Sequence, residues 1–219
     1  MPLILQENIE NGEIGLWKIT EEIEDLLSSA KLSVSEKITY SEISAHHRKK
    51  EWLATRALLN KLIYQPHLIK YHTDGRPYLE NSTINISITH CTGFVAILLH
   101  ASCLPGIDAE HTSRQVSKVA SRFISPEELS DCSDKTGFSN RRMLMHWCAK
   151  EAIFKMAPIS NIEFSNDIRI FLKDSDEDSG SFQGIFNYKS TPIPITLYYK
   201  IVDKVLIVWG WTNEVSFIH

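Results

Sequence analysis

Two acidic residues in the middle of the sequence have the type and spacing of a metal-binding pair. Asp108 and Glu110 lie in residues 106–110, GIDAE, which we expect to be extended. In an extended chain, residues two positions apart point to the same side, so both carboxylates can converge on one hard cation such as Mg²⁺. A single Asp-x-Glu triplet is a weak signal, and two ordinary surface acids at a strand end are the alternative.

A second group of polar residues lies in residues 147–155, WCAKEAIFK. On a helix, Trp147, Glu151 and Lys155 follow one another at four-residue steps along one ridge. Glu151 is therefore a candidate for a third metal ligand or a general base, and Lys155 for the neutralisation of a phosphate. The alternative is an amphipathic helix with a surface Glu–Lys pair.

Two weaker motifs come earlier in the chain. His90 lies in the motif SITHC, at the end of a predicted strand and before a turn, where a histidine can donate to a phosphate or a leaving group near neutral pH. Arg76 follows an Asp-Gly turn that Pro77 stiffens, and an arginine on a fixed loop suits a phosphate. A structural histidine and a plain turn are the alternatives.

Some familiar ligand-binding motifs are excluded. Asp174, Asp176 and Asp178 alternate like the start of a calcium loop, but loop positions 6 and 12 are Ser179 and Ile185 instead of Gly and Glu. We therefore expect residues 173–181 to form a solvated acidic loop. The glycine-rich phosphate loops GxxxxGK[ST] and GxGxxG are missing from the sequence as well.

Hydrophobic periodicity predicts the elements that position these residues. We expect strands at 14–19, 83–89, 94–100, 193–201 and 205–211, and helices at 21–30, 44–64, 114–122 and 140–156. Pro158 should end the last helix, and a further helix should begin after the capping sequence Ser125-Pro126-Glu127-Glu128. Each half of the chain thus supplies helices followed by paired strands, with a division near Pro105.

Composition excludes several classes of protein. The chain has 219 residues and a formal net charge of −4, so the basic excess of a general nucleic-acid-binding protein is missing. We expect no membrane span, since the sequence has no run of about 18 apolar residues, and no secretory signal at the N-terminus. Four cysteines without a CxxC pair indicate free thiols in a reducing cytoplasm.

The order of the motifs resembles that of the 4′-phosphopantetheinyl transferase superfamily. Gly-Arg-Pro, Ser-Ile-Thr-His-Cys, Gly-Ile-Asp-Ala-Glu and Trp-Cys-Ala-Lys-Glu-Ala-Ile-Phe-Lys follow one another in this chain. The resemblance is to the larger single-chain type, which activates peptide-synthetase and acyl carrier proteins. It implies an α/β (α+β) pseudo-dimer of two similar halves, residues 1–105 and 106–219, each with helices packed on a small antiparallel sheet. The active site would lie between the halves, and the second half would carry the metal-binding motifs.

The resemblance also implies roles for individual residues. The three carboxylates match metal ligands that hold a pyrophosphate: Asp108, Glu110 and Glu151. The resemblance assigns phosphate or nucleotide contacts to Lys155, Lys150, His90, Thr89, Arg76, and Arg56 or Arg48. Glu151 would be the catalytic base, acting directly or through a metal-bound water, and Asp108 and Lys155 would be catalytic as well.

The implied reaction transfers the 4′-phosphopantetheine arm of coenzyme A to a serine of an apo acyl or peptidyl carrier protein, with Mg²⁺ as cofactor. Adenosine 3′,5′-bisphosphate would leave, in a cytoplasmic pathway of fatty-acid or secondary-metabolite biosynthesis. The carrier would meet residues 111–135, where Arg114, Lys118, Arg122 and Phe123 are candidates for contact. We expect a monomer, because a pseudo-dimer needs no partner chain. Two alternatives are a catalytically inactive coenzyme A-binding partner protein and a Mg²⁺-dependent coenzyme A pyrophosphatase.

Overall fold

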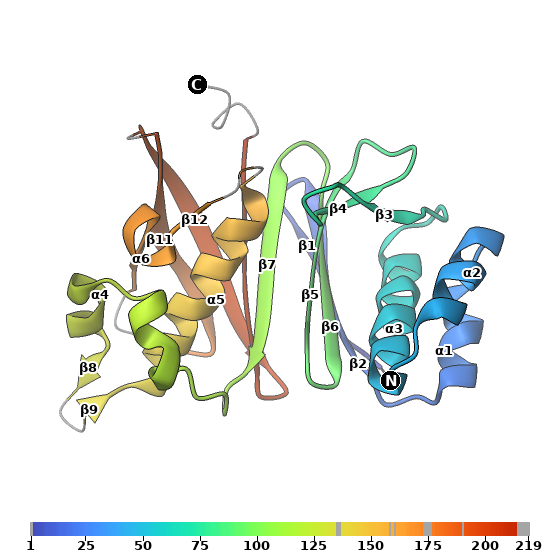
Figure 1. The fold of residues 1–219 in the computed structure, drawn as a ribbon, viewed down its shortest axis with the longest axis horizontal. Coiled ribbons are helices and arrows are strands. Elements are labelled where there is room, and N and C mark those ends of the chain that lie inside the picture. Colours follow the sequence, from blue (N-terminus) through green and yellow to red (C-terminus); the bar gives the residue numbers. More distant parts are fainter. Residues whose placement is uncertain are drawn as a thin grey trace. The chain divides into compact units, whose positions relative to one another are not determined.

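The computed structural model describes residues 2–134, 137–157, 159, 161–172, 177–189 and 191–213. The chain forms two compact units, which divide between Ser102 and Cys103. Each unit carries helices and an antiparallel sheet, which confirms the predicted α+β fold class (Figure 1). Pro158, which was expected to end a helix, and Asp174 and Asp176, which were compared with a calcium loop, lie outside the described residues.

The first unit, called unit 1 below, contains a four-stranded antiparallel sheet in the order β1-β2-β6-β5. Its strands are β1 (Leu3–Ile9), β2 (Gly12–Lys18), β5 (Asn85–Cys91) and β6 (Phe94–His100). A separate small ribbon pairs β3 (Ile69–Tyr71) with β4 (Pro77–Leu79). The predicted strands at 14–19, 83–89 and 94–100 correspond to β2, β5 and β6, whereas β1, β3 and β4 were not predicted.

The helices of unit 1 are α1 (Ile23–Ala30), α2 (Val34–Glu42) and α3 (His46–Leu62). Helix α3 buries the apolar stripe that the sequence predicted, including Leu53, Ala57 and Leu58, in one cluster with β6 residues such as Ile97. Helix α2 has no buried residue, which is why hydrophobic periodicity did not reveal it.

The second unit, called unit 2, contains a five-stranded antiparallel sheet in the order β10-β11-β12-β13-β7. Its strands are β7 (Leu104–His111), β10 (Ile168–Phe171), β11 (Ser179–Tyr188), β12 (Thr191–Val202) and β13 (Val205–Thr212). The predicted hairpin is confirmed as β12 and β13, while β10 and β11 were missed. Residues 179–181, expected in the acidic loop, belong to β11, and residues 173–176 of that loop are not described.

The helices of unit 2 are η1 (Ser117–Arg122, a 3₁₀ helix), α4 (Pro126–Asp131), α5 (Asn140–Met156) and α6 (Phe164–Asp167). A short ribbon joins β8 (Ser133–Asp134) to β9 (Gly137–Phe138). Helix α5 packs against the sheet beside β7 (Figure 1). The predicted helices at 140–156 and after Ser125 are confirmed, but the one at 114–122 is shorter and is a 3₁₀ helix.

Candidate functional site

A close approach of α5 to β7 brings predicted site residues together. A Cβ atom at Gly106 on β7 would overlap the backbone carbonyl oxygen of Ala152 on α5, so only glycine permits this contact. Asp108 and Glu110 follow Gly106 at steps of two and therefore share its face of the strand. The helix thus presents its own polar side chains to the face that carries both carboxylates.

Lys155 on α5 contacts Asp108 on β7 directly. Its Nζ lies 2.9 Å from Oδ1 of Asp108 and donates a 2.8 Å hydrogen bond to the carbonyl oxygen of Ile107. The Asp108 side chain is 8% exposed and that of Lys155 is 25% exposed. The ion pair is therefore only partly screened by solvent, while part of the lysine side chain stays accessible from outside.

Glu151 lies one helical turn before Lys155 and shares its electrostatic surroundings. Burial raises the pKa of Glu151, and the negative charge of Asp108 raises it further, whereas Lys155 and Arg114 act in the opposite direction. A carboxylate whose pKa is raised towards neutrality is suited to accept and release a proton. The sequence prediction that Glu151 and Asp108 act at one place is consistent with this coupling.

Glu110, the third predicted ligand, forms an ion pair with Arg114. The guanidinium carbon of Arg114 lies 5.1 Å from the centre of the Trp147 ring on α5. Arg114 also lowers the pKa of Glu151. The acidic face of β7 and the half-buried ridge of α5 are thus bridged by two cations of the chain, Lys155 and Arg114.

The chemistry of these donors fits Mg²⁺, which prefers oxygen ligands and is commonly held by one or two carboxylates together with substrate phosphates. Within the described ranges, no group of three or more His, Cys, Asp or Glu side chains has the spacing of a metal site built by protein alone. The carboxylates of Asp108 and Glu110 contact Lys155 and Arg114 instead. The donor set therefore suits an ion whose other ligands come from phosphate or water.

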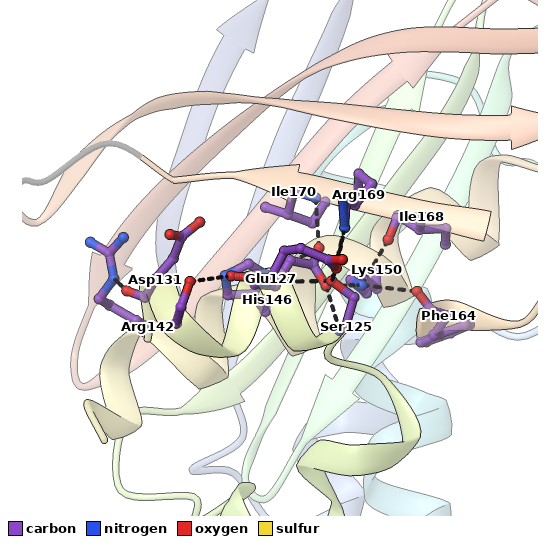
Figure 2. A network of polar contacts seen from close by, with 12 residues as sticks. Ser125, Glu127, Asp131, Arg142, His146, Lys150, Phe164, Ile168, Arg169 and Ile170 are labelled. Atoms are coloured by element: carbon purple, nitrogen blue, oxygen red, sulfur yellow. Dashed lines mark hydrogen bonds and ion pairs between the residues drawn. The ribbon is translucent and has the colours of Figure 1, made fainter. Parts of the chain in front are cut away.

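Lys150 is separate from this face, although it is next to Glu151 in sequence. Its side chain is 0% exposed, and Nζ donates to Oε2 of Glu128 at 2.6 Å. The other two bonds run to the carbonyl oxygens of Phe164 and Ile168, as Figure 2 shows. An ammonium group has three donors, so these bonds use all of them. The structure therefore gives Lys150 a buried role in place of the phosphate contact that the resemblance implied.

Unit 1 has a pocket of about 410 Å³ that collects other predicted binding residues. Arg48 and Arg56 reach it from α3, His90 reaches it from β5, and the residues on both sides of Arg76 complete one wall. Nη1 of Arg48 lies 3.0 Å from Nε2 of His90. The carboxylate of Glu51 lines the same pocket and lies 3.3 Å from Arg48 Nη1 and 3.8 Å from His90 Nε2. Arg48 and His90 thus already face one carboxylate oxygen, which is the kind of group that an anion-binding site would hold.

Arg56 forms a flat wall of the pocket. Its guanidinium carbon lies 3.3 Å from the centre of the Trp52 ring, and Nε lies 3.0 Å from Oε1 of Glu36. Burial lowers the pKa of Arg56, while Tyr71 and Glu36 act to raise it. A stacked guanidinium of this kind keeps its charge and a fixed orientation.

Thr89 and Arg76 differ from the other predicted contacts. Thr89 is 4% exposed and precedes His90, so it points to the opposite face of β5 and away from the pocket. Arg76 lies in an exposed turn, where Nε donates a 2.8 Å hydrogen bond to Oδ2 of Asp74. Hydrogen bonds from Arg76 in turn lower the pKa of Asp74. The pocket therefore unites Arg48, Arg56 and His90, with Arg76 next to it and Thr89 outside.

The candidate carrier-contact residues are only partly at the surface. Lys118 and Arg122 are exposed on η1. Phe123, in contrast, is 1% exposed and packs edge-on against Trp147 with ring centres 5.2 Å apart. Phe123 belongs to the core of unit 2, because an aromatic ring at the end of a short 3₁₀ helix is buried more favourably than it is solvated.

Sequence reasoning missed Glu36, Tyr71 and Glu128 as partners of predicted residues. Glu36 and Glu128 each complete a capping box with a serine three residues earlier, Ser33 and Ser125. The Ser-x-x-Glu pattern was a readable signal for the first of these, as it was for the second. The ion pairs of these glutamates with Arg56 on α3 and Lys150 on α5 join residues that are far apart in the sequence. Contacts of this kind cannot be predicted from a single sequence.

Comparison with known families gives one match. Residues 105–201 match the model of the 4′-phosphopantetheinyl transferase superfamily. The match supports membership of that superfamily for this segment. The matched segment contains β7 and α5 with Asp108, Glu110, Glu151 and Lys155, whereas the pocket of unit 1 lies outside it. A search of curated proteins gave no significant match.

This match supports the transfer of phosphopantetheine as the general activity. The family's donor is coenzyme A, and its acceptor is a carrier protein. As for the membrane, no helix in the described part of the chain is long and apolar enough to span one.

Proposed function

We propose that this chain is a phosphopantetheinyl transferase that moves the 4′-phosphopantetheine arm of coenzyme A to a serine of an apo acyl or peptidyl carrier protein in a Mg²⁺-dependent reaction. The observation that carries the proposal is the convergence of Asp108, Glu151 and Lys155 where α5 meets β7. These residues lie inside the segment that matches the superfamily. The product released is adenosine 3′,5′-bisphosphate.

The pocket of unit 1 supplies the proposed binding site for the nucleotide end of coenzyme A. Arg48 and His90 are 3.0 Å apart and both line the pocket, so an anionic oxygen can contact both. The stacked pair of Arg56 and Trp52 adds a flat, positively charged surface, which suits an aromatic base or a phosphate. This pocket would contribute affinity more than chemistry.

The carboxylates of Asp108, Glu110 and Glu151 would hold Mg²⁺ against the pyrophosphate. When bound, the ion offsets the negative charge of the phosphate oxygens, which otherwise repels a nucleophile. Lys155 adds a fixed positive charge beside Asp108. Such preorganised charge stabilises a transition state more than the ground state when it is aimed at the oxygens on which charge develops.

Glu151 is the proposed general base. Serine is a weak nucleophile until its proton is removed, and the raised pKa of Glu151 makes this carboxylate a suitable acceptor. The serine Oγ forms a bond to the phosphorus that carries the pantetheine arm. The bond from this phosphorus to the bridging oxygen breaks, and its electron pair leaves on adenosine bisphosphate.

A cytoplasmic setting and action as a single chain are parts of the same proposal. All four cysteines lie in the described residues, and none of them is in a disulfide. Free thiols support a reducing compartment, since disulfides persist mainly in oxidising ones.

A carrier-loading assay tests the proposal. The chain is incubated with coenzyme A, Mg²⁺ and a panel of purified apo carriers from fatty-acid, polyketide and peptide synthesis, and each carrier is weighed by mass spectrometry. We expect a gain of one phosphopantetheine arm on at least one carrier, which a serine-to-alanine carrier does not show. Coenzyme A binding without any gain would favour the inactive binder, and adenosine bisphosphate released without a carrier would favour the pyrophosphatase.

A further inference from the structure

A buried glutamate connects three elements of unit 2. Glu128 is 2% exposed and sits at the start of α4, where Oε2 accepts from the backbone amide of Ser125 at 2.9 Å. Oε1 accepts from the backbone amide of Ile170 on β10 at 2.8 Å. On α5, Lys150 donates to Oε2 at 2.6 Å and Nδ1 of His146 lies 3.6 Å from Oε1. One carboxylate thus links α4, β10 and α5.

The charge state of Glu128 follows from these contacts. Burial alone would raise its pKa, but the nearby His146 ring and the hydrogen bonds from Lys150 and the Ser125 amide outweigh that effect and lower the pKa to about 2. Burial lowers the pKa of Lys150, while Glu128 acts to raise it. The pair is therefore a buried ion pair whose partners are also hydrogen-bonded to backbone.

This ion pair lies on the buried side of α5, and Lys150 comes one residue before Glu151 in the sequence. His146 and Lys150 are one turn apart on the helix, and Lys150 also bonds the carbonyl oxygen of Ile168 at 2.7 Å (Figure 2). Glu151 is the next residue, so it projects about 100° around the helix axis from Lys150. Any rotation of α5 about its axis therefore moves Glu151 and Lys155 relative to β7.

Small rotations of α5 matter on the scale of the chemistry. A side-chain atom about 5–6 Å from the axis moves by roughly 1.4 Å when a helix rotates by about 15°. A misplacement of about 1 Å can lower a reaction rate by roughly 10²-fold. The bond of Lys155 to Asp108 at 2.9 Å leaves little room for such a shift.

We propose that Glu128 is a positioning residue for the transfer reaction, which through Lys150 fixes the rotation of α5 and so holds Glu151 and Lys155 against Asp108. This inference rests on the proposed function. A purely stabilising role is the alternative, but buried ion pairs often add little net stability compared with apolar residues of similar size. We therefore expect the pair to act mainly by fixing the rotation of α5, and less by raising the stability of the fold.

The test replaces the ion pair with neutral residues of similar size, in the double variant E128Q/K150M. The double variant leaves no unpaired buried charge, and E128Q alone is a second choice because Lys150 can then still donate to Phe164 and Ile168. Glu127→Gln is the matched control. It removes an ion pair between α4 and β10, with Glu127 Oε2 2.7 Å from Arg169 Nη1, that has no bond to α5.

Two readouts separate positioning from stability, both corrected for the folded fraction measured by circular dichroism. The first is kcat and KM for coenzyme A in the carrier-loading assay. The second is Mn²⁺ affinity in the absence of coenzyme A and carrier, measured by electron paramagnetic resonance. We expect the double variant to lose about tenfold or more in kcat, with KM changed less than about threefold and Mn²⁺ affinity lowered. The control E127Q should match wild type in all three.

The outcomes are distinct. Unchanged kcat and Mn²⁺ affinity in the folded double variant would overturn the positioning role, as would losses that only follow the unfolded fraction. If neither double variant nor E128Q folds, the pair is a stability element and the proposal fails. If wild type loads no carrier but binds Mn²⁺, the proposed function fails, and the change in Mn²⁺ affinity alone decides the positioning role. A wild-type chain that does neither overturns both.

Discussion

The two units use the same local device for different ends. In unit 1, Glu36 completes the capping box of α2 and pairs with Arg56 on the 17-residue helix α3. In unit 2, Glu128 completes the capping box of α4 and pairs with Lys150 on the 17-residue helix α5. In both, one glutamate satisfies the start of a short helix and a buried cation of a long one.

The surroundings of the two cations make the difference. Arg56 lines a pocket and stacks on Trp52, so its guanidinium plane forms part of a surface that a ligand can meet. Lys150 is sealed, and its three donors face Glu128 and two backbone carbonyls. A planar guanidinium with five donors can serve a fold and a ligand together, whereas a sealed ammonium serves the fold alone.

The largest predicted effect concerns catalysis and belongs to unit 2. Glu151→Gln should lower turnover by about 10²–10⁴-fold, because the amide cannot accept the serine proton. Coenzyme A affinity, assigned here to unit 1, should change little. Carrier loading gives turnover, and calorimetry gives affinity. The matched control is Glu163→Gln, which should leave both unaltered, and near-normal turnover in E151Q would remove Glu151 from the role of base.

Removing the cation of each glutamate ion pair should lower the unfolding free energy more in unit 2 than in unit 1. Lys150→Met leaves the buried Glu128 charge without its cation and should cost about 3–5 kcal/mol of unfolding free energy. Arg56→Met should cost less, because Glu36 is 13% exposed and water can reach it. Urea unfolding measures both. Equal losses of unfolding free energy in the two variants would show that water does not stabilise the unpaired Glu36 carboxylate.

Lowering the pH should reduce the unfolding free energy of unit 2, because Glu128 becomes protonated. Its pKa in the folded chain, about 2, is below the unfolded value of 4.5, so its stabilising contribution is complete above 4.5 and is lost as the pH falls towards 2. The shift corresponds to about 3 kcal/mol as an order of magnitude. Unfolding free energies of wild type and E128Q/K150M from pH 6 to 2.5 should converge, and parallel curves would contradict the assignment.

The smallest predicted effect concerns unit 1. Arg56→Lys keeps the charge but loses the stacked plane on Trp52, so coenzyme A affinity should fall by about tenfold with little change in kcat. Titration calorimetry measures the affinity. Lys61→Arg, at the end of the same helix, is the control. Unaltered affinity in R56K would show that charge alone, and not a planar stacked group, is used in the pocket.

The sequence predicted an element best where the periodicity within that element alone was enough to identify it. The apolar stripe of α3 and the four-residue ridge of α5 predicted two helices to within two residues at each end. Helix α2 escaped prediction because it buries no side chain, and β1 and β11 escaped because strand signals are short and depend on their neighbours.

The same limit applies to the site. Alternation along β7 and spacing along α5 suffice to place Asp108 with Glu110 and Glu151 with Lys155, and the structure brings Asp108 and Lys155 into contact. Lys150 shows where motif reasoning stops, because neighbours in sequence point about 100° apart on a helix. Only the packed fold shows that one of them is sealed against Glu128.

Gly106 has a consequence for how this site can vary. The atom that a Cβ at position 106 would overlap is a backbone oxygen, that of Ala152, which no substitution at position 152 can remove. The spacing between helix and strand is therefore beyond the reach of compensating mutations between these two positions. Variation in the reaction must come from the length and charge of the side chains that cross the gap, and not from moving the helix.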